Sequence, residues 1–151
     1  HMYFYRWPDN SCFQNSVKKL KDEITSILNQ DKSIKKISLI GHSYGGILVT
    51  QLLKDWNLST PIEIHVIASP LLGTPMLNSM CAYEPISAIP KKSVLYEWRT
   101  QFQLDNVFKN LNEDPQRIEL NGSLVTTLPD TYKGNRLGHN WSISWVADEA
   151  F

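Results

Sequence analysis

The residues with the clearest chemistry lie at positions 41–45, which read Gly-His-Ser-Tyr-Gly and fit the pattern Gly-x-Ser-x-Gly. An apolar run typical of a strand precedes them and a helical pattern comes after them, so Ser43 stands at a strand-to-helix turn. Such a turn strains the backbone and pushes the serine hydroxyl out of the sheet edge, while Gly41, Gly45 and Gly46 leave room for strand and helix to approach. The pattern therefore predicts nucleophilic chemistry on Ser43.

A serine hydroxyl is a weak nucleophile at neutral pH, so an imidazole must take its proton during attack. The chain has four histidines. His1 belongs to a start typical of a cloning remnant, His42 lies inside the turn itself, and His65 alternates within an expected strand. His139 is therefore the candidate general base, and it would later return the proton to the leaving group.

Three segments resemble the α/β-hydrolase superfamily, especially its lipase-like and esterase-like members. Residues 37–46 resemble the nucleophile elbow, and residues 67–75, Ile-Ala-Ser-Pro-Leu-Leu-Gly-Thr-Pro, are similar to a loop beside the acyl site. Residues 137–141, Leu-Gly-His-Asn-Trp, are similar to the segment that supplies the catalytic histidine. They stand in the family's order, nucleophile first and histidine last, and together span most of the chain. The resemblance implies a serine hydrolase that cleaves a carboxylic ester or thioester through an acyl-enzyme.

The acidic member of a Ser-His-Asp triad is where the sequence departs from this resemblance. Relatives carry an aspartate in a turn after the strand that we expect at 117–120, but the corresponding position here holds Leu124 or Val125. Asp130 lies on the same loop, so we predict that it orients the ring of His139. Asp9 is the second choice and Glu84 the third.

The oxyanion site is expected at the same turn. The helix start directs the amide of Tyr44 toward negative charge on a carbonyl oxygen. The family's His-Gly-like loop, which supplies a second donor, has no counterpart in this sequence. The turn that contains Trp7 and Asp9 is predicted to lie beside Ser43 and to donate the missing N–H. Trp7 and Trp141 are also candidates to line an acyl pocket.

The elements that must position these residues alternate between strand and helix, which is typical of an α/β fold. We expect a single domain over residues 1–151, built as a three-layer α/β/α sandwich with a short, mostly parallel sheet, that is, a minimal α/β-hydrolase fold. The expected strands are 3–7, 37–40, 62–68 and 117–120, the expected helices are 13–28, 47–56, one or two within 94–111, and one from 141, and loops or a lid occupy 71–92.

The composition excludes several other classes. The chain has 151 residues, of which 42% are hydrophobic, and its formal net charge is zero, which disfavours nucleic acid as a partner. No apolar run approaches the roughly 18 residues of a membrane span, and the start has no signal-peptide layout. No phosphate loop or metal motif occurs, so we predict neither cofactor nor metal. Cys12 and Cys81 lack zinc spacing and form either one disulfide or two free thiols.

Two alternatives to the hydrolase remain open. An acyltransferase would pass the acyl group to another alcohol instead of water. A hydrolase-like module that no longer catalyses a reaction would serve as a binding or assembly partner. The absence of the family's acid and oxyanion loop favours this second alternative. An uncovered strand edge at residues 3–7 would also favour a homo-oligomer. The sequence leaves the compartment open.

Overall fold

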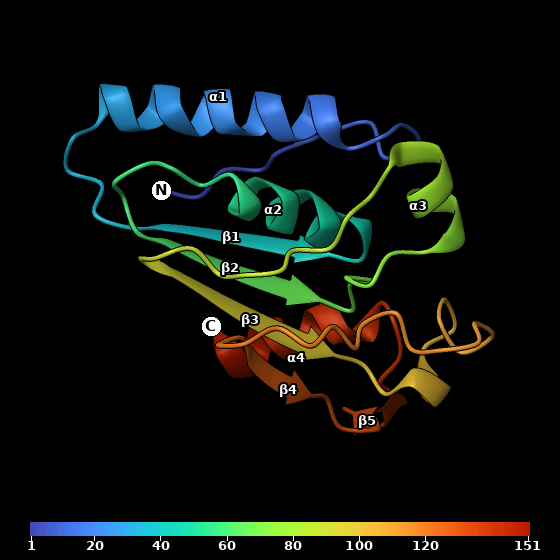
Figure 1. The fold of residues 1–151 in the computed structure, drawn as a ribbon. Coiled ribbons are helices and arrows are strands. Elements are labelled where there is room, and N and C mark those ends of the chain that lie inside the picture. The colour runs from blue at the N-terminus through green and yellow to red at the C-terminus, as the bar shows by residue number, and fades with distance from the viewer.

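The core of the fold is a parallel sheet of four strands in the order β1-β2-β3-β4, as the computed structural model of residues 1–151 shows (Figure 1). Ile37 pairs with Ile62, and Ile62 pairs with Ser93, so the first three strands start level with one another. Their carboxyl ends therefore meet at one edge of the sheet. The strands are β1 (Ile37–His42), β2 (Ile62–Ile67), β3 (Ser93–Arg99) and β4 (Leu124–Thr127).

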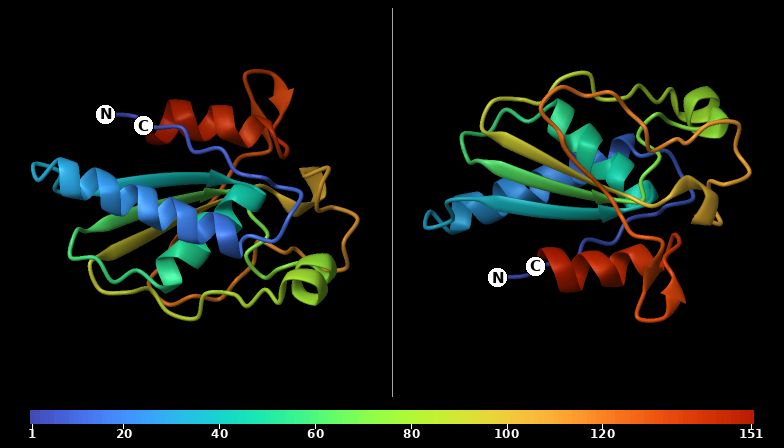
Figure 2. Two further views of the ribbon diagram at one scale, coloured as in Figure 1. Left: turned by 90° about the horizontal axis from the view of Figure 1, so that it is seen from above. Right: turned by 90° about the horizontal axis from the view of Figure 1, so that it is seen from below.

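Helices cover both faces of this sheet (Figure 2). Helices α1 and α2 share one hydrophobic cluster with β2 and β3, and α4 packs over the other face in a second cluster. This arrangement confirms the predicted three-layer α/β sandwich. The remaining elements are α1 (Gln14–Gln30), α2 (Tyr44–Lys54), α3 (Pro75–Cys81), the 3-10 helix η1 (Phe102–Leu104), the hairpin of β5 (Thr131–Tyr132) and β6 (Asn135–Arg136), and α4 (Trp141–Ala150).

The burial of each helix follows its sequence pattern. In α1, Leu20 and Ile24 are buried one turn apart, and the outer face carries an exposed ion pair between Lys18 and Asp22. Helix α2 is buried along most of its length because it lies between α1 and the sheet. A helix that is apolar on nearly all sides is expected in such an inner position.

Three expected elements are wrong. Residues 3–7 form no strand, although Tyr5 and Trp7 pack against the cluster beneath α1 and α2. The edge strands of the sheet are therefore β1 and β4, and a homo-oligomer through a strand at 3–7 loses its basis. Residues 117–120 are irregular, and the fourth strand begins at Leu124.

The third error concerns residues 94–111, which contain β3 and η1 instead of long helices. The apolar residues of β3 face both sides of the sheet: Leu95 belongs to the cluster with α1 and α2, and Trp98 packs against the cluster with α4. Apolar residues on both faces remove the alternation of apolar and polar residues that marks a half-exposed strand, so the segment has a sequence pattern like that of a helix.

The segment at 71–92 contains α3 between irregular loops. Much of it is anchored to the core, because Leu71, Leu77 and Tyr83 are buried. The hydroxyl of Tyr83 donates a hydrogen bond of 2.7 Å to the carbonyl of Leu71, and burial raises the pKa of this tyrosine. None of the helices combines the length and the apolar character that crossing a bilayer requires.

A disulfide between Cys12 and Cys81 resolves the open question about the two cysteines. It joins the segment before α1, at Cys12, to the last residue of α3, Cys81, and the two Cα atoms are 5.3 Å apart. The side chain of Gln14 donates a hydrogen bond of 2.6 Å to the carbonyl of Cys81 at the same place. The bond closes a loop across a sequence separation of 69 residues.

We expect the double variant Cys12→Ser, Cys81→Ser to unfold at a lower temperature than the parent protein. A disulfide that closes a long loop restricts the unfolded chain and typically stabilises a fold by about 2 to 5 kcal/mol. Thermal unfolding followed by circular dichroism, with and without a reducing agent, measures the effect. The reductant should lower the midpoint of the parent protein only, and an equal shift in the double variant would contradict the assignment.

Candidate active site

Ser43 occupies a strained backbone conformation between β1 and α2, with φ 53° and ψ −121°. A non-glycine residue rarely adopts positive φ, and such strain is common at functional sites. The turn is fixed at both ends: the amide of Ser43 donates to the carbonyl of Ile67 at 2.9 Å, and the amide of Gly46 donates to the carbonyl of Ser43 at 3.0 Å. The end of β2 therefore holds the serine in place.

Two of the three glycines around the serine are required by close packing. A Cβ atom on Gly41 would lie 2.4 Å from the carbonyl oxygen of Gly45, and one on Gly46 would lie 1.9 Å from Oγ of Ser69. Gly45 itself has nothing within 4 Å of such an atom. The close approach of strand and helix thus depends on Gly41 and Gly46, and the prediction that Gly45 also supplies clearance is wrong.

Tyr44 is the first residue of α2, so its N–H has no acceptor within the helix. Its ring contacts that of Trp7, with centroids 4.9 Å apart, and its hydroxyl donates to the carbonyl of Ser11 at 3.2 Å. The structure therefore brings Trp7 next to the serine turn, although no strand carries it there. Asp9 is exposed and forms no salt bridge.

His139 is bound through its side chain to Asp105, with Nδ1 2.9 Å from Oδ2. The histidine is 9% exposed and the aspartate 0%. Phe108 covers the imidazole edge-on, with ring centroids 5.0 Å apart. This bond fixes the orientation of the ring and leaves Nε2 as the atom available for proton transfer.

Asp105 is held as an ionised acceptor by several donors. Its Oδ2 also accepts a hydrogen bond of 2.6 Å from the hydroxyl of Thr100, and its Oδ1 accepts from the amides of Val107 and Phe108 at 2.9 Å and 3.2 Å. Burial raises the pKa of this carboxyl, but the hydrogen bonds from His139 and Thr100 outweigh it, so the pKa lies below its usual range. The carboxylate therefore stays charged at neutral pH.

The carboxylates that the sequence suggested for orienting the ring of His139 make no hydrogen bond to it. Asp130 is exposed, and it is its backbone carbonyl that accepts a hydrogen bond, from the amide of Leu137. Glu84 is exposed and offers its carbonyl to Gln51 and Lys54 of α2. Asp105 was missed in the sequence because the residues before it were assigned to a helix. Had 93–99 been identified as a strand, the first aspartate after it would have been an obvious candidate.

The serine turn and the histidine loop meet at the same edge of the sheet. The ring of His42 lies 4.7 Å from that of His139 between centroids, and its Nε2 lies 3.0 Å from the His139 carbonyl oxygen. Ser43 and His139 form no direct hydrogen bond with each other, and such bonds often tighten only when substrate binds. Trp141 begins α4 two residues after His139 and is half-exposed.

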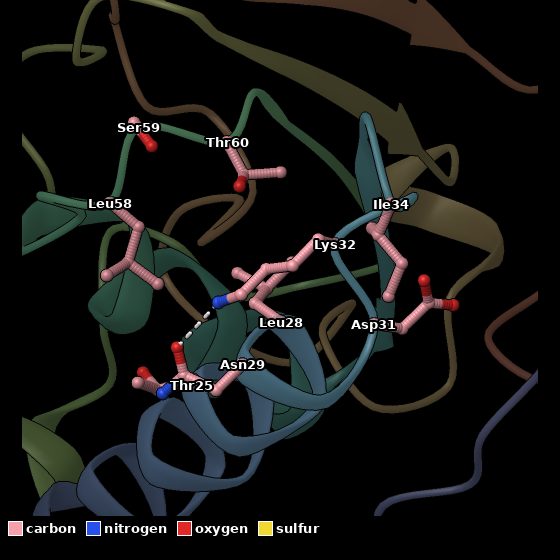
Figure 3. Close-up of a pocket in the computed structure, with 9 residues that line it drawn as sticks. All are labelled: Thr25, Leu28, Asn29, Asp31, Lys32, Ile34, Leu58, Ser59 and Thr60. Atoms are coloured by element: carbon pink, nitrogen blue, oxygen red, sulfur yellow. Dashed lines mark hydrogen bonds between the residues drawn. The ribbon is translucent and has the colours of Figure 1, made fainter.

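Two cavities of the molecule have neither Ser43 nor His139 in their lining. One of about 250 Å³ opens between the end of α1 and the loops before β1 and β2, near Leu28, Lys32 and Leu58 (Figure 3). It is at the amino ends of the strands, opposite the edge that holds Ser43. The other, of about 330 Å³, lies between residues 72–78 and 110–115, which come after β2 and β3.

Comparison with protein families matches residues 12–143 to the family described as PGAP1-like alpha/beta domain. Searches among curated proteins and among solved structures found no match. The matched range contains the parallel sheet, the serine turn, Asp105 and His139. Since the match covers most of the chain, and the fold agrees with it, this protein belongs to the PGAP1-like alpha/beta domain family, a member of the α/β-hydrolase superfamily.

Proposed function

We propose that the protein is a serine hydrolase that cleaves a carboxylic ester or thioester, with Ser43 as nucleophile, His139 as general acid and base, and Asp105 as the group that orients the histidine. The observation that carries the proposal is the hydrogen bond of 2.9 Å between His139 Nδ1 and the buried Asp105. This histidine–aspartate pair lies at the same edge of the sheet as Ser43, whose backbone is strained. The family match supports the proposal, because α/β-hydrolases use a serine, an acidic residue and a histidine together as a catalytic triad.

The reaction would follow the usual order of acyl transfer. Oγ of Ser43 attacks the carbonyl carbon while Nε2 of His139 takes the hydroxyl proton. The proton then passes to the leaving alcohol or thiol as the bond to it breaks, leaving an acyl-enzyme. A water molecule, deprotonated by the same nitrogen, releases the carboxylic acid and restores the serine. Asp105 keeps the proton of the neutral ring on Nδ1 and stabilises the imidazolium that forms.

The amide of Tyr44 is our candidate for one oxyanion donor. It is the first N–H of α2, and the positive end of the helix dipole favours negative charge there. The turn after Trp7 is the candidate for the second donor, because the contact between the rings of Trp7 and Tyr44 places that residue beside α2. Trp7 and Trp141 remain candidates to line the acyl site.

The alternatives differ in the fate of the acyl-enzyme or in whether it forms. Transfer to an alcohol instead of water would use the same residues. A binding or assembly module without turnover was favoured by the missing acid, and the carboxylate of Asp105 supplies an acid at hydrogen-bond distance from His139. We therefore favour a working hydrolase over a degenerate module.

The proposal is tested by labelling with a fluorophosphonate probe, which reacts with activated serines. We expect the parent protein to be labelled on Ser43 and the variant Ser43→Ala to remain unlabelled. Ser69→Ala is a matched control, since this nearby buried serine already donates its hydroxyl to the carbonyl of Ile67. A folded parent protein that takes up no probe would favour the binding module.

The two candidate acids are distinguished by the variants Asp105→Asn and Asp130→Asn. Loss of the orienting carboxylate in a serine triad can lower turnover by about 10⁴ while some catalysis remains. We expect a loss of this order in Asp105→Asn and a change of less than about threefold in Asp130→Asn, since substitutions at exposed positions are usually mild. Turnover of an activated ester measures both, with thermal unfolding as the check on folding. The reverse order would restore Asp130 as the acid.

The substrate class is tested with p-nitrophenyl esters of increasing acyl length and with a matching thioester. We expect release of the phenol above the buffer rate, and the chain length with the highest kcat/KM reports the size of the acyl site. An absence of release with every member of the series would remove the esterase assignment while leaving the family membership intact.

A further inference from the structure

The two halves of the proposed site come from distant parts of the sheet. Ser43 follows β1, the outer strand on one side of the sheet, whereas His139 follows the outer strand on the other side, β4, and the β5–β6 hairpin (Figure 1). The side chain of His139 is bound to Asp105, which follows β3. That bond orients the ring relative to β3 but does not connect it to the strand that carries the nucleophile.

A hydrogen bond from the residue next to the nucleophile makes this connection. Nε2 of His42 lies 3.0 Å from the backbone carbonyl oxygen of His139. His42 is the last residue of β1, where it pairs with Ile67, so its backbone is fixed in the sheet. Because Ser43 directly follows it, the bond spans the gap between the serine turn and the histidine loop.

We propose that His42 is a positioning residue of the active site, which fixes the His139 loop at the correct distance from Ser43 by donating its Nε2–H to the His139 carbonyl. This inference rests on the proposed function for its catalytic consequence. It does not make His42 a catalytic residue, since its ring nitrogen is committed to a backbone oxygen.

The chemistry of the contact fixes the form of the His42 ring. A carbonyl oxygen only accepts hydrogen bonds, so Nε2 of His42 must carry the proton. Burial lowers the pKa of His42, and the positive charge that His139 can carry lowers it further, although the bond to the His139 carbonyl and the nearby Asp105 act in the opposite direction. A neutral ring is the form that this position needs, since a second positive charge beside His139 would oppose its protonation during attack.

The same carbonyl provides a matched control. The hydroxyl of Ser142, in the first turn of α4, also donates to it, at 2.5 Å. This second bond joins the loop to its own helix and not to β1. Removing either donor deprives the carbonyl of one hydrogen bond, but only the loss of His42 disconnects the histidine loop from the nucleophile.

The experiment compares the variants His42→Phe, His42→Gln and Ser142→Ala in kcat, KM, rate of labelling by the fluorophosphonate probe, and thermal unfolding midpoint. Phe keeps an aromatic ring without the donor, while the amide of Gln retains an N–H at a similar distance along the side chain. A misplacement of about 1 Å can cost about a hundredfold in rate. We expect kcat and the labelling rate of His42→Phe to fall by about ten- to a hundredfold, with KM nearly unchanged.

His42→Gln should recover most of this loss, and Ser142→Ala should stay within about threefold of the parent, because the Ser142 hydroxyl joins the loop to its own helix and leaves the bond to β1 in place. The inference is overturned if His42→Phe keeps full kcat, if Gln fails to restore it while the protein stays folded, or if Ser142→Ala loses as much. A rate loss in His42→Phe that merely follows a lowered unfolding midpoint also overturns it.

Failure of the proposed function has a different signature. If the parent protein shows neither labelling nor ester cleavage, the hydrolase assignment fails, and the bond is then tested by ¹⁵N NMR of the histidine rings. We expect His42 to carry its proton on Nε2 in the parent protein, and the amides around His139 to shift in His42→Phe more than in His42→Gln. Protonation on Nδ1 instead would overturn the inference without reference to activity.

Discussion

The level parallel register of β1, β2 and β3 is the constraint on which the site depends. Because Ile37, Ile62 and Ser93 stand side by side, the three strands also end almost level, with His42 beside Ile67 and Ile67 beside Trp98. Residues that follow any of these strands within a few positions therefore lie at the edge formed by the carboxyl ends of the strands. Ser43 after β1 and Asp105 after β3 reach that edge by this means, and the chain after β4 returns His139 to it. The hydrogen bond from the amide of Ser43 to the carbonyl of Ile67 holds the serine turn against the end of β2.

Local signals in the sequence were sufficient to predict the turn that carries Ser43. The serine turn is encoded within ten consecutive residues, where glycines, a short apolar strand and a helix start all agree, so the prediction of β1 and α2 is confirmed. The three-layer architecture also followed from local patterns in the first half of the chain. The helices and strands there alternate at regular intervals, and each is long enough to show its period.

The carboxylate that binds His139 could not be found in the same way, because its placement depends on contacts distant in sequence. Asp105 is recognisable only from its neighbours in space: the hydroxyl of Thr100, two backbone amides and the imidazole of His139, which lies 34 positions further along the chain. Asp130 is closer to His139 along the chain, which made it the better guess, but the β5–β6 hairpin separates them. The strand β3 was not recognised for a related reason, since apolar residues on both of its faces replace the alternation of a half-exposed strand.

The disulfide gives the molecule a property that the sheet alone would not supply. The covalent ring from Cys12 to Cys81 encloses α1, β1, the serine turn, α2 and β2. A protease that cut an exposed turn inside this ring, such as the one after α1, would leave both fragments covalently joined. The nicked protein would keep its apparent mass until a reductant released the pieces. The elements on either side of Ser43 are thus protected against dissociation after a single break in the chain.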